Sequence, residues 1–329
     1  MPAHSRRRFL AGAAGFSAAS LSAALLGGIS GCKPRAKVED GQAAPVELEH
    51  PVIDAHIHTN FFDAPTREDA ESRSLVFTPA GLRKEMRLAG VKQAISLGYE
   101  PDGEEISRTA ANPMVRLPEG ETDDKVRYVA GINPYMLDDA NLQAIDTALA
   151  GGRLLGLKLY LGYYPLPPDD PRYLPVYELA GKHRKPVLMH TGDTYSPNAK
   201  VRFAHPLPID DMAVDFRGTT FILCHLGNPW TLDAAELLYK NENVFADLSG
   251  LVVGDAEFFT REMGNRGFND VINRIQEAFA WSEDPTKFLY GSDWPLVPMY
   301  HYQQLIAQAI PPEHRRAVFH DNAVRVFGL

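Results

Sequence analysis

The sequence predicts an α/β fold of the (β/α)8 TIM-barrel type, and two of its features lead to this prediction. From Pro51 onward, short and largely apolar runs alternate with longer stretches that have the apolar spacing of amphipathic helices. Most of the short runs are almost continuously apolar, which is typical of parallel strands that are buried on both faces. Eight strand–helix units within a stretch of this length are the number and size expected for one such barrel.

Each predicted element follows from the local pattern of apolar residues. The eight predicted strands are Val52–Ala55, Val91–Leu97, Val126–Ile132, Leu155–Leu159, Pro186–Met189, Thr220–Cys224, Asn243–Asp247 and Lys287–Tyr290. The amphipathic segments between them predict helices over Pro79–Leu88, Asp139–Leu149, Val176–Arg184, Leu232–Tyr239 and Asp270–Phe279. The first helix has a clear start signal, because Thr78 can cap it and Pro79 occupies its first position. An open doubly wound sheet is the alternative, but no Gly-rich phosphate-binding loop follows the first strand.

Residues 1–48 differ from the rest of the chain and predict an export signal with a tether. Arg6 and Arg7 form the pair of a twin-arginine signal, and a mildly apolar run rich in Ala, Gly and Ser follows them. That run is too Gly-rich and too weakly apolar to predict a transmembrane helix. It ends in Ile29-Ser30-Gly31-Cys32, which resembles the bacterial lipobox, in which cleavage before the cysteine leaves that residue acylated. A plain signal peptide that is cut near the same place is the alternative.

The predicted organisation is therefore a signal peptide over residues 1–31, a flexible tether over 32–48 and a single barrel domain over 49–329. We expect the protein to be exported and anchored to a membrane through lipidated Cys32, on the periplasmic or cell-surface side. The net charge of −9 and the lack of a long basic run argue against nucleic acid as a partner. The two cysteines, Cys32 and Cys224, do not predict a disulfide framework.

Polar side chains stand at the carboxyl ends of several predicted strands. His56 and His58 end the first strand two residues apart, so that on an extended backbone both rings face the same side. His190 follows the fifth strand, His225 follows the sixth, and Asp293 follows the eighth. In a barrel these strand ends meet at one mouth, where active sites are built.

Imidazole nitrogens and a carboxylate oxygen at one mouth predict a site for a divalent metal. Zinc suits this donor set best, and iron, manganese or nickel would also be compatible with it. For any single histidine the alternative is a hydrogen-bonded residue near a strand end, and for His225 both interpretations stay open. Cys224 precedes His225 by one residue, so strand alternation predicts that its thiol points away from the mouth into the layer between strands and helices.

Six stretches in this order resemble the amidohydrolase-related branch, amidohydrolase family 2, of the amidohydrolase superfamily. They read VIDAHIHT, GLKLY, PVLMHTGD, CHLGNP, ADLSG and YGSDWP, and the segment His320–Leu329 fits the usual end of that family. The resemblance covers Pro51 to Leu329. It implies that His56, His58, His190 and Asp293 bind the metal, and that Asp293 and His225 carry the catalysis.

The resemblance leaves some functional questions open. Lys158 ends the fourth strand, where it could bind a substrate carboxylate or, when carboxylated, bridge two metals; one ion is favoured over two. Hydrolysis of a small amide, lactone or ester-like substrate is the leading interpretation, with Asp293 accepting the water proton and His225 stabilising oxyanion charge. Non-oxidative decarboxylation of an aromatic or unsaturated carboxylic acid is the alternative, and an inactive binding lipoprotein is a third. Motif neighbours that could shape the pocket are Tyr160, Asp193, Trp230, Asp247 and Trp294.

Overall fold

The computed structural model describes residues 45–59, 78–98, 125–152, 154–194 and 196–329. All of them lie within one compact unit that extends from Gln42 to Leu329. The predicted signal peptide, Cys32 and most of the predicted tether lie outside the described residues, as do residues 60–77 and 99–124. Among the helices that are described, none is long and apolar enough to span a membrane.

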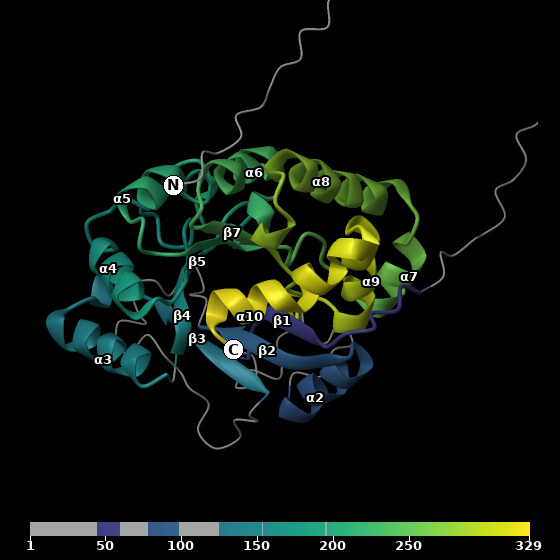
Figure 1. The fold of residues 1–329 in the computed structure, drawn as a ribbon, viewed down its shortest axis with the longest axis horizontal. Helices are drawn as coiled ribbons and strands as arrows, with labels where there is room; N and C mark the ends of the chain where they lie inside the picture. Colours follow the sequence, from purple (N-terminus) through teal and green to yellow (C-terminus); the bar gives the residue numbers. More distant parts are fainter. Residues whose placement is uncertain (1–44, 60–77, 99–124, 153, 195) are drawn as a thin grey trace, which may run out of the picture. The chain divides into compact units, whose positions relative to one another are not determined.

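The described chain forms a parallel eight-stranded barrel in which the strands follow one another in chain order (Figure 1). The strands are β1 (Val52–Ile57), β2 (Val91–Leu97), β3 (Val126–Ile132), β4 (Leu154–Leu159), β5 (Val187–Met189), β6 (Phe221–Leu223), β7 (Val244–Asp247) and β8 (Phe288–Leu289). The ring closes where the amide of Ala55 donates to the carbonyl oxygen of Tyr290 at 2.9 Å. An isolated parallel bridge between Ile57 and Trp294 continues this closure. The predicted TIM barrel is thus confirmed.

Most of the helices lie on the outside of the strands (Figure 1). The described helices are α2 (Pro79–Leu88), α3 (Asp139–Ala150), α4 (Leu174–His183), α5 (Ile209–Asp215), α6 (Thr231–Lys240), α7 (Ala256–Glu262), α8 (Arg266–Ser282), α9 (Met299–Ala309) and α10 (Asn322–Phe327). The five predicted helices are present, and Thr78 caps α2 by accepting a hydrogen bond from the amide of Gly81. Helices α5, α7, α9 and α10 were not predicted from the sequence, and α9 is buried on almost every side, including Gln303 and Gln304.

One hydrophobic core fills the inside of the barrel, and a second lies between the strands and the surrounding helices. The inner core takes residues from every strand: Ile53, Ile95, Val129, Leu155, Leu188, Ile222, Phe245 and Leu289. Ala323 and Phe327 of α10 belong to the same cluster, so α10 packs against the barrel interior. The outer core joins the other faces of the strands to the surrounding helices. The polar side chains at the strand ends therefore stand on a densely packed interior.

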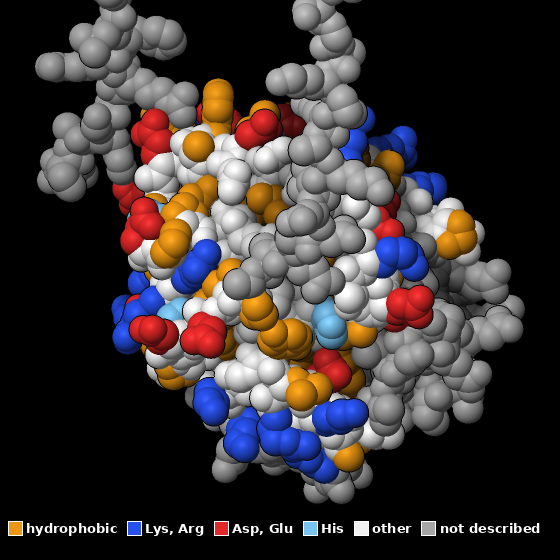
Figure 2. Space-filling model, turned by 90° about the vertical axis from the view of Figure 1, so that its right-hand side faces the viewer, with side chains coloured by type: hydrophobic (Ala, Val, Ile, Leu, Met, Phe, Trp, Pro, Cys, Tyr) orange, Lys and Arg blue, Asp and Glu red, His pale blue; other side chains and the backbone are white. Residues whose placement is uncertain are grey.

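The first described residues are held on the barrel rather than extended from it. The amide of Val46 donates to Oε1 of Gln304 at 2.7 Å, and Nε2 of Gln304 donates back to the carbonyl oxygen of Val46. Val46 and Leu48 also pack against the outer core. Figure 2 shows acidic, basic and hydrophobic side chains interspersed over the middle of one face, with Lys and Arg side chains gathered along its lower edge.

Candidate active site

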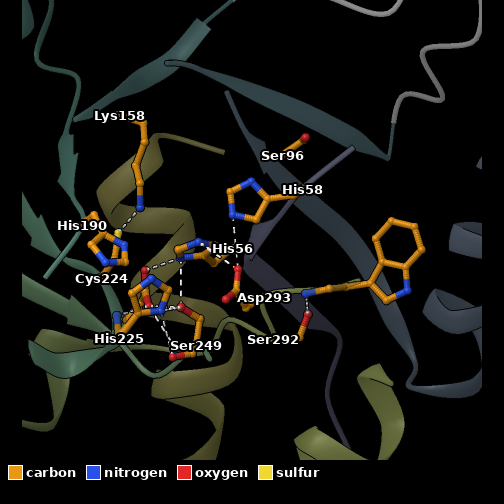
Figure 3. A network of polar contacts seen from close by, with 12 residues as sticks. His56, His58, Ser96, Lys158, His190, Cys224, His225, Ser249, Ser292 and Asp293 are labelled. Atoms are coloured by element: carbon orange, nitrogen blue, oxygen red, sulfur yellow. Dashed lines mark hydrogen bonds and ion pairs between the residues drawn. The ribbon is translucent and has the colours of Figure 1, made fainter. Parts of the chain in front are cut away.

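The carboxyl ends of the strands surround a cavity of about 270 Å³. The predicted site residues that line it are His58, Lys158, His190, His225 and Asp293 (Figure 3). His56 lies fully buried behind them, with its ring centroid 5.2 Å from that of His58 and 4.9 Å from that of His225. The structure therefore brings all six residues, from five different strand ends, to one mouth of the barrel.

The backbone of β1 is irregular at the point where its side chains stop packing in the inner core and begin to face the site. Ile53 and Ala55 belong to the inner core, and the register with β2 shifts between Asp54 and Ile57. This shift lets His56 and His58 reach the mouth. Close packing against the end of β8 requires a glycine, because a Cβ atom on Gly291 would lie 2.7 Å from the Cβ of His56.

Asp54 joins β1 to the loop after β8. Its Oδ1 accepts hydrogen bonds from the amide of Ser292 at 2.9 Å and from the amide of His56 at 3.2 Å. Burial raises the pKa of Asp54 to about 7, although these hydrogen bonds oppose the rise. The side chain thus has a structural function at the base of the site.

Three side chains place metal-ligand atoms close together. Oδ1 of Asp293 lies 3.4 Å from Nε2 of His56 and 3.2 Å from Nε2 of His58. Both Nε2 of His56 and Oδ1 of Asp293 are buried without a hydrogen-bond partner, which is costly for polar atoms unless something else binds them. Nitrogen and carboxylate donors in this arrangement could hold a divalent metal, and the residues present fit such an ion.

A buried carboxylate orients His56 from behind. Oδ2 of Asp247 lies 2.8 Å from Nδ1 of His56, so Nδ1 carries the proton and Nε2 keeps its lone pair for the metal group. Burial by itself would raise the pKa of Asp247, but the neighbouring His56 and its hydrogen bond hold that pKa well below its usual range. Asp247 therefore remains a carboxylate in the barrel interior.

His190 lies at the cavity but outside the group of three converging ligand atoms. Its Nε2 lies 2.8 Å from the carbonyl oxygen of Asp193, which can only accept, so Nε2 carries the proton and Nδ1 keeps a lone pair. Burial lowers the pKa of His190 well below its ordinary value, which keeps the ring neutral. Its role as a metal ligand stays a prediction.

The loop that holds His190 is tied to the next strand end and to α8. The amide of Asp193 donates to the carbonyl oxygen of Asn228 at 2.8 Å. Arg274 of α8 donates in turn to Oδ1 of Asn228 at 2.6 Å. A Cβ atom on Gly192 would lie 2.2 Å from the carbonyl oxygen of Asn228, so only glycine permits this approach.

Comparison with known families identifies the chain at this point. The profile of the family described as Amidohydrolase matches residues 53–329. The chain belongs to the amidohydrolase family. This assignment agrees with the motif resemblance, and the protein is therefore an enzyme of the amidohydrolase superfamily. No protein in a search of curated proteins matched the chain.

Several solved structures resemble this amidohydrolase in fold. An uncharacterized TIM-barrel protein from Bordetella bronchiseptica has a TM-score of 0.60 at 18% identity, covering 85% of this chain and 99% of that one. A 2,6-dihydroxybenzoate decarboxylase from Rhizobium has a TM-score of 0.57 at 15% identity, covering 84% and 98%. A probable 2-pyrone-4,6-dicarboxylic acid hydrolase from Acinetobacter baumannii has a TM-score of 0.53 at 14% identity, covering 86% and 100%. Proteins of this fold thus include a decarboxylase and a probable hydrolase.

Lys158 of the amidohydrolase lies in the cavity wall beside Cys224. Its Nζ is 2.8 Å from Sγ of Cys224, and Lys158 is only 1% exposed. The thiol is buried as predicted, and burial raises its pKa well above the ordinary value. The predicted direction of the Cys224 side chain is wrong, because Sγ belongs to the inner core. Cys224 continues the alternation of β6 from Ile222, which also belongs to the inner core, whereas His225 leaves the strand conformation with a φ of 61°.

The remaining cavity wall of the amidohydrolase combines aromatic and apolar side chains. Tyr160 and Tyr163 lie on one part of it, and the apolar residues are Leu251, Val252, Val253 and Leu296. Asp193 also lines the cavity, as the sequence analysis allowed. Trp294 is fully buried, and Trp230 packs against His205 with ring centroids 4.7 Å apart. These two tryptophans are not among the residues that line the described cavity.

From the sequence, Asp247 was predicted only as a residue that could shape the pocket, and no role was predicted for Ser249. Both belong to the ADLSG motif and stand two residues apart at the end of β7, the same spacing as His56 and His58. Oγ of Ser249 lies 2.9 Å from Nδ1 of His56 and 2.9 Å from Nδ1 of His225. The i, i+2 spacing of polar residues after a strand was thus a signal for these residues too.

Proposed function

We propose that this amidohydrolase is a metal-dependent hydrolase of small amide, lactone or ester-like substrates. The observation that carries the proposal is the position of Asp293. Its carboxylate lines the cavity and also approaches Nε2 of both His56 and His58. One group can therefore bind the metal and accept a proton beside the reacting centre.

His56, His58, His190 and Asp293 would hold a single divalent ion, and zinc is the ion that their nitrogen and oxygen donors suit best. Such an ion, when bound, polarises a carbonyl group as a Lewis acid and lowers the pKa of water. Burial keeps His190 neutral, and the hydrogen bond between Nδ1 of His56 and Asp247 leaves Nε2 of His56 unprotonated. Each ring can therefore offer the metal a nitrogen with a free lone pair.

The remaining steps belong to side chains of this chain. Asp293 accepts the proton of the attacking water and passes it to the leaving group. Burial would raise the pKa of Asp293, but His56 and the other nearby histidines hold it below its usual range, so the group is a carboxylate before reaction. The apolar side chains of residues 251–253 line part of the cavity, where they would contact apolar parts of the substrate.

A second candidate is non-oxidative decarboxylation of an aromatic or unsaturated carboxylic acid, and Lys158 favours it. Its side chain is almost fully buried and lines the cavity, where its ammonium group can bind a carboxylate. In a hydrolase the same lysine would bind a carboxylate elsewhere on the substrate. Only one metal is required by either reaction.

A substrate screen tests both candidates on the same protein sample. Esters, lactones, amides and aromatic acids are supplied to the purified enzyme, product and CO2 release are followed, and metal content is measured in parallel. Hydrolysis of the neutral substrates without CO2 release supports the first candidate, and CO2 release from the acids supports the second. If the purified protein takes up no stoichiometric metal, the third interpretation, an inactive binding lipoprotein, is favoured instead.

We also propose that the enzyme acts outside the cytoplasm as a membrane-anchored lipoprotein. The Arg6-Arg7 pair and the Ile29–Cys32 segment support this location. A twin-arginine route exports folded proteins, which suits an enzyme that takes up its metal before export.

A further inference from the structure

Ser249 connects His225 to a carboxylate that does not itself contact the cavity. Its hydroxyl donates to Oδ1 of Asp247 at 2.5 Å. Its Oγ also lies 2.9 Å from Nδ1 of His225 (Figure 3). The carbonyl oxygen of Ser249 lies 3.1 Å from the same Nδ1. His225 thus faces two oxygen atoms of one residue.

The number of available protons decides which way these hydrogen bonds run. Oδ1 of Asp247 accepts from the amides of His225 and Ser249 as well as from the hydroxyl of Ser249. The single hydroxyl proton of Ser249 therefore lies between Oγ and Oδ1. The carbonyl oxygen of Ser249 can also only accept. Both oxygens near Nδ1 of His225 are therefore acceptors, and Nδ1 must supply the proton. With the opposite tautomer, a nitrogen lone pair would face a carbonyl oxygen at 3.1 Å in a buried site, which is unfavourable.

The backbone around Ser249 is shaped to permit these contacts. Gly250 has a φ of 58°, and a Cβ atom there would lie 2.6 Å from Oδ2 of Asp293 and 3.0 Å from Nδ1 of His225. His225 has a φ of 61° and Asp293 a φ of 72°, in a region that residues with a side chain rarely adopt. The amide of His225 also donates to Oδ1 of Asp247 at 2.9 Å. The backbone and the ring of His225 are thus oriented by the same carboxylate.

We propose that Ser249 is a positioning residue that holds His225 in its Nδ1–H tautomer, leaving the Nε2 lone pair for the cavity. In this tautomer Nε2 of His225 is a hydrogen-bond acceptor towards the cavity, while Asp293 takes the proton of the attacking water. His225 can donate to developing oxyanion charge, the role expected from the sequence, only after it has gained a proton at Nε2. This mechanistic consequence rests on the proposed hydrolase function, whereas the tautomer itself does not.

Nitrogen-15 NMR of the full-length protein, labelled at histidine, tests the tautomer without any substrate. Protonated and unprotonated ring nitrogens give separate signals, and His225→Gln identifies the pair that belongs to residue 225. We expect a protonated Nδ1 and an unprotonated Nε2 in the wild-type protein. An Nε2–H tautomer, or a ring protonated at both nitrogens at neutral pH, would overturn the proposal.

Variants of Ser249 test whether this residue is the cause. In Ser249→Ala we expect loss of the single Nδ1–H state and appearance of an Nε2–H signal, because only the longer contact to the backbone carbonyl remains. Ser249→Thr keeps the hydroxyl and should restore the wild-type signals. Ser282→Ala removes the hydroxyl of another buried serine, one that donates to Phe279 in α8, and should change nothing at His225. An unchanged tautomer in Ser249→Ala would show that Ser249 does not set it.

The same samples separate this inference from the proposed function. Metal content should remain near the wild-type level in Ser249→Ala, because Asp247 still accepts from His56. If the NMR signals follow the expected pattern while the substrate screen shows only decarboxylation, the positioning role of Ser249 holds and the hydrolase proposal fails.

Discussion

Nδ1 of His56 and Oδ2 of Asp247 lie 2.8 Å apart, although the two residues are 191 positions apart in the sequence. Both side chains are almost completely buried, at 0% and 1% exposure. This contact fixes the tautomer of His56 and directs its Nε2 towards His58 and Asp293. A carboxylate with no direct access to the cavity therefore controls a predicted metal ligand.

Asp247→Asn should weaken metal binding by about 10- to 100-fold, because changes to residues that orient a ligand histidine typically have that effect. Asparagine keeps the shape but removes the negative charge that favours Nδ1–H on His56. Titration against a chelator of known affinity measures the change. Asp233→Asn, at an exposed position on α6, is the control. Equal metal affinity in both variants would contradict the orienting role.

His56→Ala or His58→Ala should sharply reduce metal occupancy, because each removes a nitrogen donor from the group around Asp293. Metal analysis of the purified variants measures this directly. His205→Ala removes a histidine that packs against Trp230 outside the cavity and should retain the wild-type metal content. If the His56 and His58 variants kept full occupancy, the metal would have to bind elsewhere.

Asp293→Asn should lower turnover of a substrate found by the screen by about 100- to 10,000-fold, the usual cost of losing a general base. Asparagine retains an oxygen donor, so metal occupancy should fall far less than turnover. His225→Ala should also slow turnover while it largely spares the metal. Steady-state kinetics and metal analysis on the same preparations give both quantities. Near wild-type turnover in both variants, with metal unchanged, would exclude the assigned catalysis.

The stability of the enzyme should depend on pH through Lys287. Burial lowers the pKa of Lys287 from 10.5 to about 8 in the folded protein, where Nζ donates to the carbonyl oxygens of Asn241 and Glu242. Between pH 8 and 10.5 the unfolded chain therefore binds more protons at this group than the folded chain does. The contribution of Lys287 accordingly makes the free energy of unfolding rise with pH across this window.

Lys287→Met should remove that contribution. Denaturant unfolding of wild type and variant from pH 7.5 to about 10.5 gives the unfolding free energy of each protein. The contributions of the other titrating groups cancel in the difference between the two. The wild type should gain stability relative to Lys287→Met as the pH rises. Lys182→Met, at a side chain that is 59% exposed, provides the control and should show a much smaller trend. A difference that stays constant with pH would show that the pKa of Lys287 is not lowered.

Cys32→Ala should leave the protein without a lipid anchor, and Arg6→Lys combined with Arg7→Lys should block its export. Both expectations follow from the predicted twin-arginine signal and lipobox. Cell fractionation and mass spectrometry of the mature N-terminus measure them, and Cys224→Ala is the control for the loss of a cysteine. Soluble wild-type protein that still begins at Met1 would contradict the predicted location.

The sequence by itself determined the alternation of strands and helices and the placement of the main site residues. Parallel strands that are buried on both faces leave continuous apolar runs, so the predicted bounds of β2 and β3 agree with the structure at both ends. His56 and His58 were recognisable because the side-chain period of a strand is local. The end of each strand is also the mouth of the barrel, which brought His190, His225 and Asp293 to the same site.

The tertiary structure alone decided how these side chains are oriented and which residues support them. The contacts of Asp247 and Ser249 with His56 join β7 to β1 across the barrel, and no local pattern specifies such partners. The side chain of Cys224 faces the interior in step with Ile222, and His225 reaches the cavity because the chain leaves the strand conformation there, where φ is positive. Helix α9 was not predicted, and its burial on almost all sides, which includes Gln303 and Gln304, arises only in the folded barrel. Local periodicity thus specifies the strands and helices. Long-range packing and the backbone angles after each strand specify which ring nitrogens carry protons and where the side chains of the site point.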